Sequence, residues 1–173
     1  DRRGALSSAS SSVIEAAAVT ARGERLPFVC VMRSSGADIV EGIAALHGWG
    51  RAARALTDCS GIVPTVFIVD GPAVSGPALL LGIADHVVMT EGAYAFVSGP
   101  AMVAEFTGVV IDNDELGGAA SHARYSGAAT LVAPDLDAAV DMVGQLLAYF
   151  PSNNDLEPPA DRKSTRLNSS HIT

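Results

Sequence analysis

Residues 66–90 (VFIVDGPAVSGPALLLGIADHVVMT) constrain the fold of this chain more than any other stretch. The β-branched and aromatic run at 66–69 has the composition of a buried strand, and the Asp-Gly-Pro at 70–72 predicts that the strand ends there. The Ser-Gly-Pro at 75–77 is typical of a helix start, with Pro in the first turn. Residues 78–83 are apolar on every face, so we expect a buried helix. The stretch therefore predicts a strand, a turn and a buried helix, followed by another strand.

The helix start suggests a binding role for backbone N–H groups. A helix that opens at a glycine turn leaves N–H groups without intrahelical partners, and such groups can hold an oxyanion when they face a cavity. Gly76 is therefore a candidate donor, and Pro77 fixes the helix start without removing that N–H. A second small-residue turn, at 34–38, also leaves an apolar strand. Two such turns facing each other would supply two donors to one developing negative charge, as a thioester enolate requires.

Side-chain chemistry gives weaker candidates. Ser75 as a nucleophile would need glycines two residues before and after it, but Ala73 and Pro77 occupy those positions. Asp38 and Glu41 could form a general acid/base pair, although their place at a helix start favours capping. His122 is the histidine that we expect nearest to a ligand.

Strand-like and helix-like segments alternate along the chain. The strand-like runs are apolar throughout rather than alternating, which is typical of a covered, largely parallel sheet in an α/β domain. A long helix is expected at 39–57, and its core face is expected to hold Ile43, Leu46, Trp49, Ala53 and Leu56. A loop is expected at 122–127. The other strands are expected at 27–32, 63–69, 85–89, 94–97 and 128–132, and the other helices at 5–22, 100–106 and 134–149.

Charge and cysteine content narrow the class of protein. The formal net charge is −8 without a basic stripe, so we expect no nucleic-acid partner. No apolar run approaches the roughly 20 residues of a membrane span. Cys30 and Cys59 have no metal-ligand spacing and indicate no disulfide scaffold. We therefore expect a cytoplasmic globular domain without a metal.

The two ends of the chain predict its domain boundaries. The chain begins at Asp1 rather than Met, which we interpret as a piece of a longer protein. Residues 160–173 are polar and aperiodic, and they resemble translated adapter sequence, with a disordered tail as the alternative. We therefore assign residues 1–159 to one partial domain and exclude the rest from the fold.

Six motifs in a fixed order resemble one enzyme family. The motifs are SSGADIVEG, GIVP, DGPAVSGPALLLGIADHVVM, VSGPAMVAEFTG, DELGGAASHARYSGAA and FPSNN. In their order and spacing they resemble the N-terminal half of the carboxyltransferase (β) subunit of biotin-dependent acyl-CoA carboxylases, such as acetyl-CoA and propionyl-CoA carboxylase.

The resemblance implies a fold, a reaction and partners. The fold is the crotonase fold, in which repeated β-β-α units make two roughly perpendicular sheets, here incomplete at the N-terminus. The reaction is carboxyl transfer from carboxybiotin to the α carbon of an acyl-CoA, with the enolate held by backbone N–H groups and without a metal. The implied partners are a separate biotin carboxyl carrier, a biotin carboxylase subunit and further copies of the full-length subunit.

The resemblance also implies site residues. Gly76 and Ala37 match the oxyanion-hole donors, Ser75 stands where the family usually has glycine and would narrow the pocket, and Ser35 and Gly36 belong to the first turn. Asp38 stands where the family commonly has Arg. The remaining matches lie in segments near the acyl and biotin pocket and are Ser98, Gly99, Gly117 and Gly118.

Two other functions stay open at this point. An enoyl-CoA hydratase or isomerase of the same fold would need two catalytic carboxylates, and residues 78–83 offer none. A non-catalytic assembly subunit of a carboxylase is the second alternative, because Asp38 and Ser75 depart from the family pattern. We expect the isolated chain to have no carboxyltransferase activity, because the family's second domain completes the active site.

Overall fold

A parallel sheet organises the protein, and a computed structural model describes it for residues 4–159. The sheet has five strands in the order β1-β2-β3-β5, with β4 paired to β2, and every pair is parallel. This confirms the parallel α/β sheet that the sequence predicts. The prediction for residues 160–173 lies outside the described residues. The strands are β1 (Phe28–Ser34), β2 (Thr65–Val74), β3 (His86–Thr90), β4 (Tyr94–Phe96) and β5 (Leu131–Ala133).

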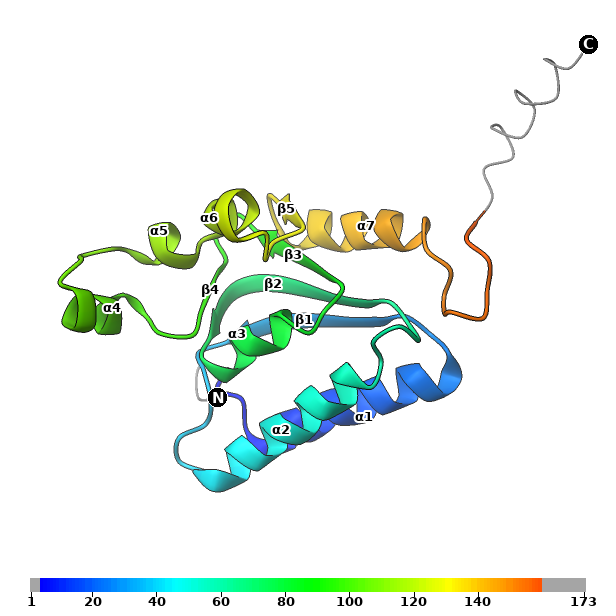
Figure 1. Ribbon diagram of the computed structural model, residues 1–173, viewed down its shortest axis with the longest axis horizontal. Helices are drawn as coiled ribbons and strands as arrows, with labels where there is room; N and C mark the ends of the chain where they lie inside the picture. The colour runs from blue at the N-terminus through cyan, green and yellow to red at the C-terminus, as the bar shows by residue number, and fades with distance from the viewer. Residues whose placement is uncertain (1–3, 160–173) are drawn as a thin grey trace, which may run out of the picture.

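Helices cover the sheet on two sides. Figure 1 shows α1 and α2 side by side along one face, α7 along the other, and α4 at the end of the molecule away from α7. No helix among residues 4–159 is long and apolar enough to span a membrane. The helices are α1 (Ser8–Glu24), α2 (Ile43–Thr57), α3 (Gly76–Leu81), α4 (Pro100–Thr107), α5 (Asn113–Gly117), α6 (Ala119–Ser121), a π-helical turn η1 (His122–Ser126) and α7 (Leu136–Leu147).

Alternate residues of β2 enter two separate cores. Phe67 and Val69 point into the larger core, which α1, α2 and α3 close. Val66 and Ile68 point the other way, into a smaller core with Ala139 and others from α7. Because successive side chains of a strand point to opposite faces, a strand buried on both faces must be apolar throughout. This is the physical reason for the continuous run at 66–69.

The sequence-based prediction that the strand ends at residues 70–72 is wrong. β2 continues to Val74, pairing with β3 up to Val69 and with β4 from Pro72 onward. Gly71 has φ +111°, a conformation that glycine adopts easily, so the chain changes partner without leaving the sheet. This change carries the carboxyl end of β2 to Ser75, beside the carboxyl end of β1.

Two further expectations are corrected. Residues 122–127 were expected to form a loop, but His122–Ser126 forms a π-helical turn whose end is fixed by the Gly127 N–H bond to the His122 carbonyl, 2.8 Å. The expected core face of α2 is also wrong at its start, since Ile43 is 83% and Leu46 is 64% exposed. In this first half, the buried face of α2 holds small residues such as Ala45 and Gly48 instead, because α1 packs closely against it, whereas Leu56 near the helix end is buried as expected.

Candidate active site

The two small-residue turns predicted from the sequence meet at one cavity. Its volume is about 440 Å³, and its walls include Ala37 from the first turn and Ser75 and Gly76 from the second. A Cβ placed on Gly36 would lie 3.6 Å from the Val74 carbonyl oxygen, so the two turns lie close enough that a single added methyl group would bring them into van der Waals contact. The cavity lies at the carboxyl ends of β1 and β2, the edge where open parallel sheets usually bind ligands.

The direction of the Ala37 N–H is fixed by backbone hydrogen bonds on both sides of it. Leu6 donates to the Gly36 carbonyl at 2.8 Å and accepts from the Asp38 N–H at 3.0 Å. The C=O and N–H of one trans peptide point in opposite directions, so the Ala37 N–H points away from Leu6. No acceptor among residues 4–159 receives it. Because Ala37 lines the cavity, this peptide presents a free donor there.

The Gly76 N–H is held in the same way. The Ser75 carbonyl, which shares a peptide with this N–H, accepts from the Ala78 N–H at 3.0 Å and so points into α3. The preceding peptide is fixed by the Ser75 N–H bond to the Phe96 carbonyl, 2.9 Å. Within the described part of the chain, no acceptor receives the Gly76 N–H. It is therefore a second free donor at the cavity.

Ser75 has a strained backbone at the junction of β2 and α3. Its φ is 61° and its ψ is −128°, a region that L-residues rarely adopt, and its side chain makes no capping hydrogen bond. Such strain costs of order 1–3 kcal/mol and persists where the surrounding structure fixes it. The strained residue directly precedes the Gly76 donor and lines the cavity.

Trp49 is one of the cavity residues that the sequence did not assign to the site, and its side chain forms a hydrogen bond with a candidate donor residue. It was expected on the core face of α2, but its indole Nε1–H donates to the Gly76 carbonyl at 2.8 Å, and its ring lines the cavity. A Cβ on Gly76 would lie 3.2 Å from Trp49 Cδ1. The available signal was that this is the only tryptophan of the chain, placed among apolar residues that turn out to face the cavity.

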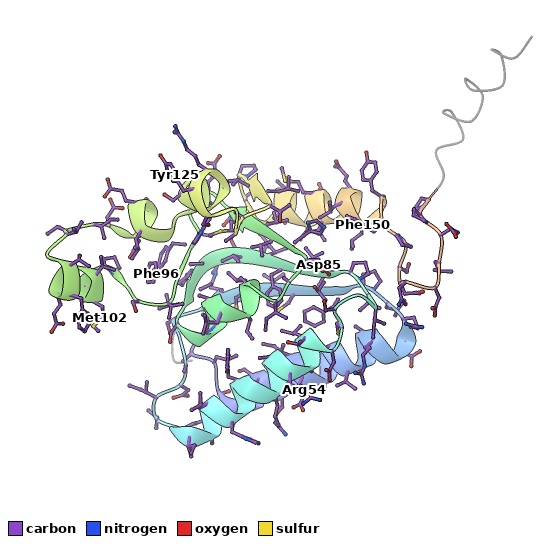
Figure 2. The ribbon with its side chains drawn as sticks, in the orientation of Figure 1. Arg54, Asp85, Phe96, Met102, Tyr125 and Phe150 are labelled. Carbon is purple, nitrogen blue, oxygen red and sulfur yellow. The ribbon has the colours of Figure 1, made fainter. Side chains whose placement is uncertain are left out.

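The other predicted site residues lie away from this cavity. A second cavity of about 340 Å³ is lined by Val97 and Leu116, among others. The predicted residues directly follow these two in the chain: Ser98 and Gly99 after Val97, and Gly117 and Gly118 after Leu116. Leu79 lines both cavities, which makes them neighbours across α3. Figure 2 shows Phe96, another wall of the second cavity, between α4 and the sheet. Ser35 and Gly36 support the first turn, so the structure brings together only part of the predicted set.

His122 lines the second cavity, but both of its ring nitrogens are engaged. Nε2 lies 2.7 Å from the Ala95 carbonyl oxygen, and Nδ1 lies 2.7 Å from Ser126 Oγ. A carbonyl oxygen only accepts, so Nε2 carries a proton and donates a hydrogen bond to the Ala95 oxygen. These contacts fix the π-helical turn against β4 and leave neither nitrogen facing a ligand.

The polar groups near the first cavity mostly serve the fold. Asp38 accepts from the Val40 N–H at 3.1 Å, and Glu41 accepts from the Ser8 N–H at the start of α1, 2.7 Å. No group of three or more His, Cys, Asp or Glu that could hold a metal occurs among residues 4–159.

Burial raises the pKa of Cys30 to about 11, so this thiol stays protonated and unreactive at neutral pH.

Comparison with solved structures identifies the fold class. A structure titled transcarboxylase 12S, with methylmalonyl-coenzyme A and methylmalonic acid bound, matches with a TM-score of 0.88 and 34% identity. The match covers 91% of this chain and 31% of that chain. The protein therefore has the crotonase-like fold of carboxyltransferases.

Sequence comparison identifies the family. The chain is 39% identical over 128 residues to the methylmalonyl-CoA carboxyltransferase 12S subunit of Propionibacterium freudenreichii subsp. shermanii. The matched stretch covers 74% of this chain and 24% of that protein. The chain is 34% identical over 134 residues to the propionyl-CoA carboxylase carboxyltransferase subunit of Haloferax mediterranei, covering 77% and 26%. Residues 3–172 match the carboxyl transferase domain family, to which this chain belongs. It spans about a quarter of the length of these relatives.

Proposed function

We propose that this chain is the part of a biotin-dependent acyl-CoA carboxyltransferase that holds the acyl thioester. The proposal rests on one observation: the Ala37 and Gly76 N–H groups are both free at one cavity, while the carbonyl of each peptide is tied back into the fold. Fixed donors of this kind stabilise an oxyanion without reorganising during the reaction. In our proposal they bind the thioester oxygen as it becomes an enolate oxygen.

The chain's own residues then act mainly through the backbone. Carboxybiotin, brought by a separate carrier protein, supplies the carboxyl group and, once free of it, a nitrogen that accepts the substrate's α proton. The enolate carbon forms the new bond to CO₂, and the electron pair held on oxygen by Ala37 and Gly76 returns to form the thioester carbonyl. This reaction needs no side-chain base. Among the described residues that line the cavity, Asp38 is the only one with a carboxylate, which agrees with that expectation.

The shape of the site suggests where the substrate lies. Ile39 and Leu46 line the cavity and are 88% and 64% exposed, so they offer an apolar wall to the arm of coenzyme A. Ser75 narrows the space beside Gly76. We propose that the acyl group and biotin lie toward the second cavity, on the other side of Leu79. Ser98, Gly99, Gly117 and Gly118 flank that second cavity. Ser35 and Gly36 keep the first turn close to the second.

The rest of the proposal concerns the assembly. We propose a cytoplasmic enzyme that works with a biotin carboxyl carrier and a biotin carboxylase subunit, without a metal in this domain, and that forms homo-oligomers. The transcarboxylase 12S structure is titled as a hexamer assembly, which supports the last point. The alternative hydratase or isomerase function is not favoured, because it needs two carboxylates and α3 (GPALLL) carries none.

A matched pair of ligands tests the oxyanion site in the 173-residue chain. Acetyl-CoA and S-ethyl-CoA differ only in the carbonyl oxygen that the two N–H groups are proposed to bind. We expect acetyl-CoA to bind roughly threefold to tenfold more tightly in isothermal titration calorimetry, because one net hydrogen bond contributes about 0.5–1.5 kcal/mol. Equal dissociation constants, or no binding of either ligand, would contradict the proposal.

A further inference from the structure

We propose that Trp49 is a positioning residue of the oxyanion site, and that its indole N–H sets the direction of the Gly76 donor. The inference rests on the proposed function of that site. It concerns a residue on α2, an element separate from both donor-bearing turns. Trp49 is also the chain's single tryptophan, which gives the protein a built-in spectroscopic probe.

The hydrogen bonds around residues 75–77 show how this positioning works. The Ser75 carbonyl is held by the Ala78 N–H, and the Gly76 carbonyl is held by Trp49 Nε1–H at 2.8 Å. Two consecutive peptide planes are thus fixed, one on each side of the Gly76 Cα. Rotation about the Gly76 backbone would move its N–H, and the indole bond opposes that rotation. A displacement of about 1 Å in such a group can change a rate by roughly a hundredfold.

The indole ring makes a second contribution by excluding side chains at position 76. A Cβ there would lie 3.2 Å from Cδ1 and 3.3 Å from Nε1 of Trp49, closer than ordinary van der Waals contact. Residue 76 has no positive φ that would require glycine. Contact with the indole therefore explains the glycine, and it keeps the donor N–H uncovered at the cavity.

Filling the core does not account for the orientation of Trp49. The ring packs on the edge of the larger core but is only partly buried, and it lines the open cavity. A buried or half-buried indole N–H usually has a partner, and here that partner is the carbonyl of the proposed donor residue itself. Phenylalanine at this position would keep most of the packing and lose only the hydrogen bond.

Trp49→Phe tests the inference with the same pair of ligands. In the wild type we expect acetyl-CoA to bind threefold to tenfold more tightly than S-ethyl-CoA. In Trp49→Phe this ratio should fall toward one, with the affinity for S-ethyl-CoA changed less than twofold. A purely structural role would weaken both ligands alike and keep the ratio. Tyr149→Phe removes a polar group from an aromatic residue that is 78% exposed, and this matched control should keep the wild-type ratio.

The wild-type protein gives a second measurement that does not depend on the variant folding. Because there is one tryptophan, its indole ¹H–¹⁵N group gives one NMR signal, and acetyl-CoA should shift it more than S-ethyl-CoA does. The inference is overturned, with the proposed function intact, if the wild type prefers acetyl-CoA but the indole signal responds equally to both ligands. It is also overturned if Trp49→Phe keeps the preference. If the wild type shows no preference, the proposed function fails and this inference fails with it.

Discussion

Two glycine-containing turns, at Gly76 and at Gly117, look alike in the sequence and differ in the structure. Both glycines lie beside another small residue, and both match segments of the family motif. At Gly76 the nearest atoms to an added Cβ belong to a tryptophan side chain, at 3.2 Å. At Gly117 the nearest atom is the Ala95 carbonyl oxygen in β4, at 2.2 Å.

The difference shows two separate reasons for a glycine. Gly117 lets α5 lie directly against the backbone of β4, and the next residue, Gly118, donates its N–H to the Asp114 carbonyl at 2.9 Å. That N–H has no capacity left for a ligand. Gly76 instead keeps its N–H free at a cavity. Substrate binding at Gly117 and Gly118 stays a prediction, while their packing role follows from the contacts.

The largest effect on stability is expected for Gly117→Ala. The new Cβ would meet backbone that can move only together with β4, so we expect a loss of about 3 kcal/mol in the free energy of unfolding, measured by urea denaturation. Gly92→Ala is the matched control: no atom lies within 4 Å of its added Cβ, so it should change stability by less than about 0.5 kcal/mol. A near-neutral Gly117→Ala would remove the packing half of the comparison.

A smaller loss of stability with a larger loss of recognition is expected for Gly76→Ala. The Cβ meets a side chain that can shift by a few tenths of an ångström, so we expect a loss of about 1 kcal/mol. The shifted indole and donor should nevertheless remove the preference for acetyl-CoA over S-ethyl-CoA in calorimetry. If Gly76→Ala keeps this preference while Gly117→Ala loses it in the folded state, the two glycines have the opposite roles.

The smallest effect is expected for Ser75→Gly, and it has the opposite sign. Glycine adopts a φ of 61° without the strain that serine bears. Glycine also has more freedom in the unfolded chain, which offsets part of the gain. We expect a net stabilisation of about 0.5 kcal/mol in urea denaturation. Removing the side chain should also widen the cavity and improve binding of propionyl-CoA relative to acetyl-CoA. A destabilised variant would show that the serine side chain has a structural partner in solution.

The long helix shows how far the pattern of apolar residues can be trusted. The sequence correctly placed a helix there, although it begins at Ile43 rather than at residue 39. The sequence assigned the large apolar residues to the core, and Leu56 is buried there. Leu46 and Trp49 line the cavity instead, with Trp49 packed on the edge of the core. The core-facing positions before Leu56 hold Gly48 and alanines, because α1 approaches so closely that a Cβ on Gly48 would lie 3.0 Å from Ser8 Cα. Periodicity gives the angle of a face around a helix, but it does not say what that face contacts.

The sequence by itself determined the parallel α/β class and the two turns that hold the candidate donors. It did so because a strand buried on both faces must be apolar throughout, and because small residues with Pro mark where strands end and helices begin. Only the tertiary structure decided that the turns share one cavity, that β2 passes through residues 70–72, and that Trp49 holds Gly76. These are contacts between residues far apart in the chain, and local composition does not encode them.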